Sequence, residues 1–187
     1  MGSPRRKFAK IYDKYVNKIY RFIYLKVDSQ ETAEDLTSQV FTKGWRRFKQ
    51  NQDIKNPSAY LYQVARAEIA DYYGKRPNFQ IVSTETNPIV NSQLTDSQPS
   101  AEENLGLQSD IETMKGALAK LDEDEQNIII WRYLDGYSNK EIARLMEKPE
   151  GTVRVMLHRA LKELKEKMEN NTQESNQNTT RPLSSRS

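Results

Sequence analysis

Residues 138–168 have the sequence SNKEIARLMEKPEGTVRVMLHRALKELKEKM, which predicts two helices joined by a tight turn. Ser138 is followed three residues later by Glu141, the pattern of a capping box at a helix start. Ile142, Ala143, Leu145 and Met146 then give the first helix an apolar face. The spacing predicts that the second helix buries Val153, Leu157, Ala160, Leu161, Leu164 and Met168. This arrangement is typical of a helix-turn-helix.

The outer face of the second helix is predicted to carry the side chains that meet DNA. These are Thr152, Arg154, Val155, His158, Arg159 and Lys162. A major groove admits one such helix, and arginine there forms paired hydrogen bonds to guanine. Pro149 is expected at the first helical position, and Lys148 before it has no capping side chain, so a DNA phosphate is a candidate acceptor for the first amides. The alternative is a pair of amphipathic helices in a bundle, with ordinary solvated cations.

Composition limits the classes of function. The chain has 187 residues, of which 36% are hydrophobic and 29% charged, which suits one ordinary domain or two small ones. It has no cysteine and one histidine, His158, so we expect no disulfide, no zinc site and no cofactor. No segment has the length and hydropathy of a membrane span, and the N-terminus lacks the apolar run of a signal peptide. A cytoplasmic protein is therefore expected.

The net charge of +3 conceals an uneven distribution. Residues 1–77 hold 16 Lys and Arg against 8 Asp and Glu, whereas residues 78–114 hold none against 6. Residues 115–169 balance at 11 of each. A basic first module is typical of a protein that binds a polyanion, although a solvated cationic surface is the alternative.

Periodicity predicts three helices in residues 1–77. An apolar stripe covers residues 8–27, Asp28 or Ser29 offers a cap for the second helix, and Asn56 with Pro57 starts a third helix that stops at Gly74. The second module, residues 111–169, adds a helix capped by Asp122 and Glu125 and closed by Gly136. The fold class is therefore all-α, with two small helical domains. Residues 78–110 are predicted to be an acidic flexible linker and residues 170–187 a disordered tail.

Aromatic residues are concentrated in the basic module, which holds eight of the ten tyrosines. Aromatic rings among cations suit single-stranded nucleic acid, whose bases stack on the rings. Tyr12, Tyr15, Tyr20 and Tyr72 fall on apolar stripes and are expected in the core. Tyr60, Tyr62 and Tyr73 flank the buried face of the third helix, and for them a base contact and a structural role remain equal alternatives.

Three stretches carry a family resemblance: AEDLTSQVFTKGWRRF at residues 33–48, AYLYQVARAEIADYYGKR at 59–76 and LDEDEQNIIIWRYLDGYSNKEIARLMEKPEGTVRVMLHRALKELK at 121–165. Together they resemble bacterial RNA polymerase sigma factors of the extracytoplasmic-function group. The likeness covers about residues 8–77 and 111–168, in the order that the family has.

The resemblance implies a role for each module. The first would bind core RNA polymerase and open the minus-ten promoter element, and the second would read the minus-thirty-five element. By position, the polymerase-binding residues would be Asp35, Leu36, Ser38, Gln39 and Phe41. The minus-ten residues would be Asn51, Asn56, Tyr60, Tyr62, Arg66, Ala67, Lys75 and Arg76. Tyr60 and Ala67 stand where the family often has tryptophan and asparagine.

In the second module, Arg154, Val155 and His158 match family positions that face bases, while Arg159 and Lys162 suit phosphates. Glu147 and Lys148 replace the glycine and the apolar residue that are common in the turn, which predicts a slightly strained turn. By the same resemblance the acidic linker would thread the polymerase channel that later carries RNA, and an inert tether is the alternative.

The expected function is thus transcription initiation with core RNA polymerase and promoter DNA, both double-stranded and melted, as partners. An anti-sigma factor is a further partner that the resemblance suggests, although no residue identifies its surface. A stand-alone helix-turn-helix regulator is the alternative function. An enzyme is not favoured, because the sequence has no catalytic constellation, no glycine-rich phosphate loop and no metal-ligand cluster, and no small-molecule substrate is expected.

Overall fold

The computed structural model describes residues 4–50, 54–75 and 111–178, with the backbone alone for residues 170–178. Over these ranges the chain forms helices and turns without a strand, so the predicted all-α fold class is confirmed. The predicted linker, residues 78–110, lies outside the described residues. None of the helices in the described ranges is long and apolar enough to cross a membrane.

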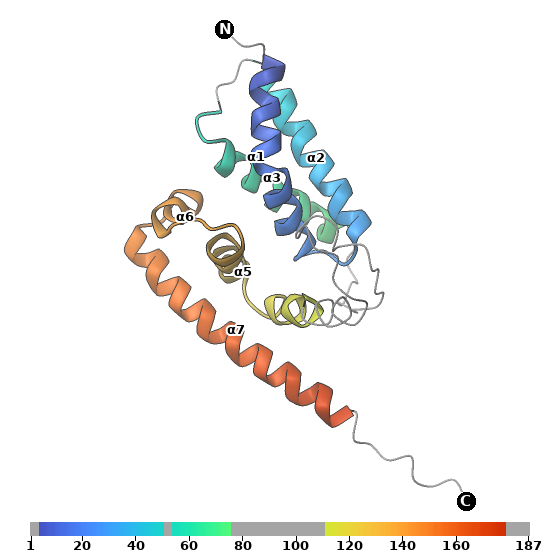
Figure 1. The fold of residues 1–187 in the computed structure, drawn as a ribbon, viewed down its shortest axis with the longest axis vertical. Coiled ribbons are helices and arrows are strands. Elements are labelled where there is room, and N and C mark those ends of the chain that lie inside the picture. The colour runs from blue at the N-terminus through green and yellow to red at the C-terminus, as the bar shows by residue number, and fades with distance from the viewer. Residues whose placement is uncertain (1–3, 51–53, 76–110, 179–187) are drawn as a thin grey trace, which may run out of the picture. The chain divides into compact units, whose positions relative to one another are not determined.

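Three helices form a bundle at the N-terminal end: α1 (Pro4–Tyr24), α2 (Gln30–Lys49) and α3 (Pro57–Gly74). Each packs against the other two (Figure 1). The core of the bundle includes Ile19, Phe22, Ile23, Val40 and Leu61, all nearly or fully inaccessible.

Local signals explain where these helices begin and end. The Ser29 side chain accepts a hydrogen bond from the Thr32 amide, and the Asn56 side chain accepts one from the Ala59 amide, so both predicted caps are confirmed. Pro57 occupies the first turn of α3, and α3 ends at Gly74 as predicted. α1 ends at Tyr24, three residues earlier than its apolar stripe, and the following turn still buries Leu25 and Val27.

Gly44 allows α2 to approach its neighbours closely. A Cβ atom at this position would lie 3.3 Å from a Leu61 methyl carbon and 3.4 Å from the Phe8 ring. Such contacts are tight, so a larger side chain would push α2 away from α1 and α3.

The described chain divides into two compact units, and the division falls within the predicted second module. The first unit joins α1, α2 and α3 to Ile130–Val153, which contains the π-helix η2 (Ile130–Leu134) and α6 (Asn139–Met146). α6 packs against α3 in this unit. The domain boundaries at residues 77, 110 and 169 remain predictions.

The second unit contains the helical residues 111–118, α5 (Glu123–Ile129) and the part of α7 (Glu150–Asn178) that follows Val153. Its buried apolar side chains are Ala117, Leu118, Leu121, Ile128, Ile129 and Ala160. The start of α5 has the predicted reciprocal cap: the Glu125 amide donates to Asp122 Oδ1 at 2.8 Å, and the Asp122 amide donates to Glu125 Oε2 at 3.4 Å.

The structure corrects three expectations about α7. Leu161 and Met168, predicted to be buried, are 39% and 36% exposed. The helix continues to Asn178, although the tail from Asn170 was expected to be disordered; residues 179–187 lie outside the described residues. Pro149 precedes the helix instead of starting it, because its carbonyl accepts the hydrogen bond from the Val153 amide as an N-cap residue does.

Candidate DNA and polymerase interfaces

The turn between α6 and α7 is built as a helix-turn-helix requires. The Ser138 side chain accepts from the Glu141 amide, and the Glu141 carboxylate accepts from the Ser138 amide at 2.8 Å, so the capping box is confirmed. The Glu141 carboxylate also accepts a hydrogen bond from the Ser138 hydroxyl at 2.7 Å, and the two bonds that it accepts from Ser138 lower the pKa of this carboxyl below its ordinary value.

The strained turn that the sequence predicts centres on Glu147, which has φ 54° and ψ 38°. This is the left-handed region, where a side chain costs about 1 to 2 kcal/mol relative to the right-handed region. The Lys148 amide donates to the Ala143 carbonyl at 3.0 Å and so ties the turn to the end of α6.

All six residues predicted to meet the minus-thirty-five element are exposed on the N-terminal half of α7: Thr152, Arg154, Val155, His158, Arg159 and Lys162. Val155 is 62% exposed, which is unusual for a large apolar side chain in a helix that buries the neighbouring Val153 completely. Positions 155, 158, 159 and 162 are three or four apart, so these side chains follow one stripe of α7. One apolar side chain surrounded by cations suits the edge of a base pair, where a thymine methyl group and phosphates lie close together.

Farther along α7 the cations have acidic partners one turn away. Lys162 Nζ lies 4.0 Å from Glu166, Lys165 lies 3.8 Å from Glu169, and Lys167 lies 3.8 Å from Glu163. Exposed pairs of this kind contribute only a few tenths of a kcal/mol. The region with an excess of positive charge on α7 is therefore its N-terminal half.

The predicted minus-ten residues have more varied environments. Tyr60 is partly exposed, and the Arg47 guanidinium of α2 lies 4.7 Å from the centre of its ring in a cation–π contact. Asn56 uses its side-chain oxygen to cap α3. Arg66 is partly exposed, Ala67 and Lys75 are exposed, and Asn51 and Arg76 lie outside the described residues.

The structure corrects the expectations for Tyr62 and Tyr12, and it gives Tyr73 a partner inside the protein. Tyr62, predicted to flank the buried face of α3, is 2% exposed and packs its ring edge-on against Phe22 and Trp131. Tyr73 donates its hydroxyl hydrogen bond to the Lys26 carbonyl at 2.6 Å. Tyr12, predicted to be buried, is 45% exposed, although its ring contacts Phe41.

The residues predicted to bind polymerase separate into two groups on α2. Asp35, Ser38 and Gln39 are exposed, whereas Leu36 and Phe41 are buried in the bundle. The buried residues fix the orientation of the helix, so the exposed three form the face that is available to a partner. The same helix carries an ion pair between Lys43 and the buried carboxylate of Glu68 in α3, which raises the pKa of Lys43 through the hydrogen bond.

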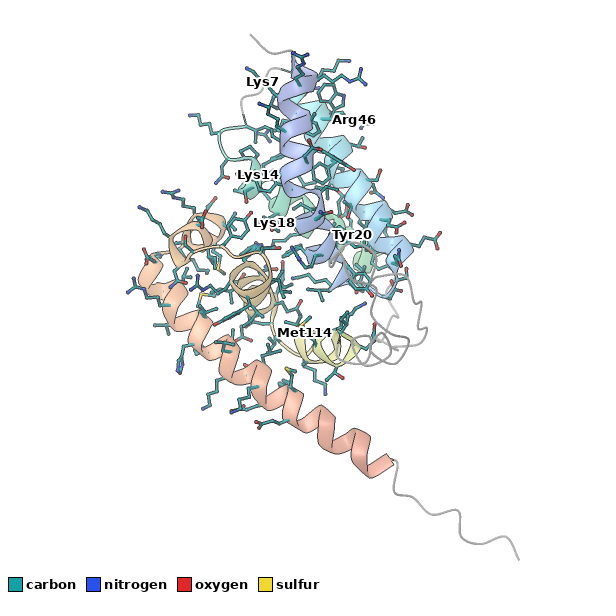
Figure 2. The ribbon with its side chains drawn as sticks, viewed as in Figure 1. Lys7, Lys14, Lys18, Tyr20, Arg46 and Met114 are labelled. Carbon is teal, nitrogen blue, oxygen red and sulfur yellow. The ribbon has the colours of Figure 1, made fainter. Side chains whose placement is uncertain are left out.

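α1 supplies much of the positive charge of the bundle. Lys7, Lys14 and Lys18 follow one another along this helix, and Arg46 lies on α2 (Figure 2). Lys7, Lys14 and Arg46 are exposed, whereas Lys18 is partly buried. This distribution accounts for the basic character of residues 1–77.

A polar cluster centred on Asp135 was not predicted from the sequence. The Asp135 side chain has no exposed surface; its Oδ2 accepts from the Tyr62 hydroxyl at 2.6 Å and its Oδ1 accepts from Arg21 Nη2 at 3.1 Å. The Lys18 ammonium donates to the Asp135 carbonyl at 2.7 Å, and the Ser58 and Tyr137 hydroxyls lie 2.8 Å apart. We call these six residues the Asp135 cluster: Lys18, Arg21, Ser58, Tyr62, Asp135 and Tyr137.

Burial dominates the electrostatics of this cluster. It raises the pKa of the Asp135 carboxyl, although Tyr62, Arg21 and Lys18 act in the opposite direction. It also raises the pKa of the Tyr62 hydroxyl far above its ordinary value, with the nearby Asp135 charge as a second cause. Tyr62 is therefore a permanent hydrogen-bond donor. No local pattern announces this cluster, because its partners lie 73 to 117 residues apart in the sequence.

Comparisons with known proteins agree with this architecture. The family model for sigma-70 region 2 matches residues 11–77, and the model for sigma-70 region 4 matches residues 111–164. The chain is 31% identical over 161 residues to the ECF (extracytoplasmic-function) RNA polymerase sigma factor BldN of Streptomyces coelicolor, covering 84% of this chain and 58% of that relative. It is also 28% identical to the RNA polymerase sigma factor YlaC of Bacillus subtilis, covering 91% and 96% of the two chains.

A solved structure shares the fold. The sigma factor RpoE from Bartonella quintana, in complex with the anti-sigma factor NepR, superposes with a TM-score of 0.64 at 21% sequence identity, over 88% of this chain and 98% of that one. Sigma factors are generally not enzymes. Both family models match in the order and at the positions of the two modules, and the chain belongs to the sigma-70 family of RNA polymerase sigma factors, in the ECF group of transcription-initiation factors.

Proposed function

We propose that this sigma factor holds a promoter at two points while it is attached to core RNA polymerase, without catalytic residues of its own. The observation that carries the proposal is the exposed, cation-bearing N-terminal half of α7 behind a capped α6. Arg154, Val155 and His158 read bases of the minus-thirty-five element, and Arg159 with Lys162 binds phosphates. Because RNA polymerase works in the cytoplasm, we expect the protein to act there.

The first module supplies the other contacts. Asp35, Ser38 and Gln39 on α2 bind core polymerase, supported from inside the bundle by Leu36 and Phe41. The minus-ten element is read at the start of α3, where Tyr60 presents a partly exposed ring with Arg47 beside it. A ring with an adjacent cation favours an unstacked base and its phosphate.

Attachment to polymerase makes two weak DNA contacts effective. Once one module is bound, the second binds as an intramolecular event at high effective concentration. Free of polymerase, the protein is expected to bind promoter DNA poorly. RpoE, whose fold this chain shares, was solved with an anti-sigma factor, and we propose that this chain also has an anti-sigma partner.

The test is run-off transcription with purified core polymerase and a pool of promoter fragments. The proposal predicts promoter-specific transcripts that require both the protein and core polymerase. A double variant, Asp35→Ala with Gln39→Ala, should reduce co-purification with core polymerase. Asp13→Asn, an exposed change on α1, serves as the control and should leave it unchanged. Transcription that is no different from core polymerase alone would contradict the proposal.

A further inference from the structure

One face of α1 carries a row of lysines. Lys7, Lys10 and Lys14 are three and four residues apart, so their side chains follow one stripe of the helix, and all three are exposed. Lys18 continues the row one turn farther on, and Figure 2 shows Lys7, Lys14 and Lys18 in order along α1. We call Lys7, Lys10 and Lys14 the lysine stripe.

The lysine stripe has no acidic partner to balance its charge. Within the described ranges, none of its three ammonium groups forms an ion pair with a carboxylate. Asp13 is the one acidic residue of α1, against seven lysines and arginines. The lysines near the end of α7 differ, because Lys162, Lys165 and Lys167 each have a glutamate one turn away. A solvated helix face in this protein thus pairs its cations, whereas α1 leaves them unbalanced.

This arrangement is unfavourable for α1 itself. Cations near the start of a helix oppose the helix dipole, and the first turn of α1 has three cations and no carboxylate. The first turns of α2 and α6 instead include Glu31 and Glu141. Like charges three or four residues apart also repel each other along the lysine stripe. A polyanion bound along α1 would turn both effects into attraction, since it supplies the negative charge that the helix lacks.

The spacing of the stripe suits a nucleic acid backbone. From Lys7 to Lys14 the helix rises about 10 Å, and over this length one strand of duplex DNA carries about three phosphates. A lysine ammonium binds a phosphate as a point charge and does not choose between bases. Three lysines on one face therefore fit three successive phosphates of a strand that runs along α1.

Contacts at the end of the row place it near the start of α3. Lys18 lies 4.4 Å from the centre of the Tyr137 ring, and the Tyr137 hydroxyl lies 2.8 Å from the hydroxyl of Ser58 in the first turn of α3. The start of α3 is also where the minus-ten element is proposed to be read. The lysine stripe thus leads away from that site along α1, where DNA next to the minus-ten element would lie.

We propose that the lysine stripe is a third DNA contact of this sigma factor, in which Lys7, Lys10 and Lys14 bind backbone phosphates next to the minus-ten element. The proposal rests on the promoter binding proposed above. It gives α1 a share of the affinity and of its salt dependence, while the choice of sequence stays with α3 and α7.

The salt dependence of promoter binding tests the stripe directly. A triple variant, Lys7→Gln with Lys10→Gln and Lys14→Gln, removes three charges and keeps good helix formers. For its complex with core polymerase, the slope of log affinity against log salt should be smaller by about 2 to 3, because each lost phosphate contact contributes about 0.7 to 0.9. The thermal unfolding temperature of this variant should equal or exceed that of the parent, since repulsion within α1 is removed.

A matched triple variant controls for net charge. Lys120→Gln, Lys165→Gln and Lys167→Gln remove three charges from the second unit, and the slope should change by less than about 1. An unchanged slope in the α1 variant, or equal changes in the two variants, would overturn the proposal. Loss of co-purification with core polymerase in the α1 variant would also overturn it, because the stripe would then bind protein. A lower unfolding temperature would do the same, because the lysines would then be structural.

A scrambled duplex separates this proposal from the promoter function. If the parent complex shows no preference for the promoter fragment over the scrambled one, the proposed function fails. The slopes of the free parent and of the free α1 variant on the scrambled duplex at low salt still decide the stripe, because phosphate contacts do not depend on sequence. The slope of the α1 variant should be the smaller, and equal slopes would overturn the proposal.

Discussion

The start of α7 and the start of α3 are both predicted to meet DNA, yet their side chains are in opposite situations. The six candidates on α7 are all exposed, and Val155 is 62% exposed. On α3, Tyr62 is buried against Asp135, Asn56 caps the helix, and the Tyr60 ring is beside Arg47. The difference indicates that the candidate side chains on α7 are accessible to a partner, whereas Tyr62 and Asn56 on α3 are engaged in hydrogen bonds inside the protein.

The largest effect should come from removing the buried ring on α3. Tyr62→Ala should lower the free energy of unfolding by about 3 to 5 kcal/mol, because it leaves a cavity beside Phe22 and Trp131 and removes the hydrogen-bond donor of Asp135 Oδ2. Val155→Ala on α7 should change it by less than about 0.5 kcal/mol. Urea denaturation measures both, and equal effects would remove the contrast between the two helices.

The next effect separates recognition from stability. Arg154→Ala should reduce promoter-specific transcription by about 5- to 150-fold, because a paired arginine–guanine contact contributes about 1 to 3 kcal/mol. Its free energy of unfolding should change by less than about 0.5 kcal/mol, the usual range for an exposed side chain. Lys165→Ala, an exposed change farther along α7, is the matched control and should retain transcription. Loss of transcription in both variants to the same degree would mean that α7 contributes charge without base reading.

A smaller effect concerns the support of the recognition helix. Ser138→Ala removes the cap of α6 and should cost about 1 kcal/mol. The pKa of the Glu141 carboxyl is lower in the folded protein than in the unfolded chain. The stability that this carboxylate contributes is therefore complete above its pKa in the unfolded chain, and it is lost as the pH falls through its pKa in the folded protein. The difference in stability between parent and Ser138→Ala should therefore shrink in acid, below the ordinary glutamate pKa of 4.5. Thermal unfolding at pH 7 and at pH 3 checks this, and a constant difference would contradict it.

The smallest effect is a gain. Glu147→Gly removes the steric cost of a side chain in the left-handed backbone region at this turn, about 1 to 2 kcal/mol. Glycine also raises the conformational entropy of the unfolded chain, which cancels part of this gain in stability. A net stabilisation of about 0.5 kcal/mol is expected, with promoter specificity unchanged. Destabilisation in a denaturant titration would show that the Glu147 side chain makes a contribution of its own.

Helix boundaries were predictable because their causes are local. Ser29, Asn56, Gly74 and the Ser138–Glu141 pair each lie within a few residues of the groups that they cap or end. The exposed candidates on α7 followed from helical spacing in the same way. Their role in reading DNA and the division at residues 77 and 110 remain predictions.

Long-range partners were not predictable. Nothing near Asp135 in the sequence indicates Tyr62 or Arg21, which are 73 and 114 residues away. Periodicity also cannot tell where a packing surface ends, so Leu161 and Met168 continue the apolar stripe of α7 and yet remain exposed.

The most direct test of the two-point account is the affinity of a promoter fragment for the free protein and for its complex with core polymerase, at one salt concentration and against a scrambled fragment. The account predicts specific binding by the complex and only weak binding, without preference for the promoter, by the free protein. Tight, promoter-specific binding by the free protein would contradict it and would favour a helix-turn-helix regulator that works without polymerase.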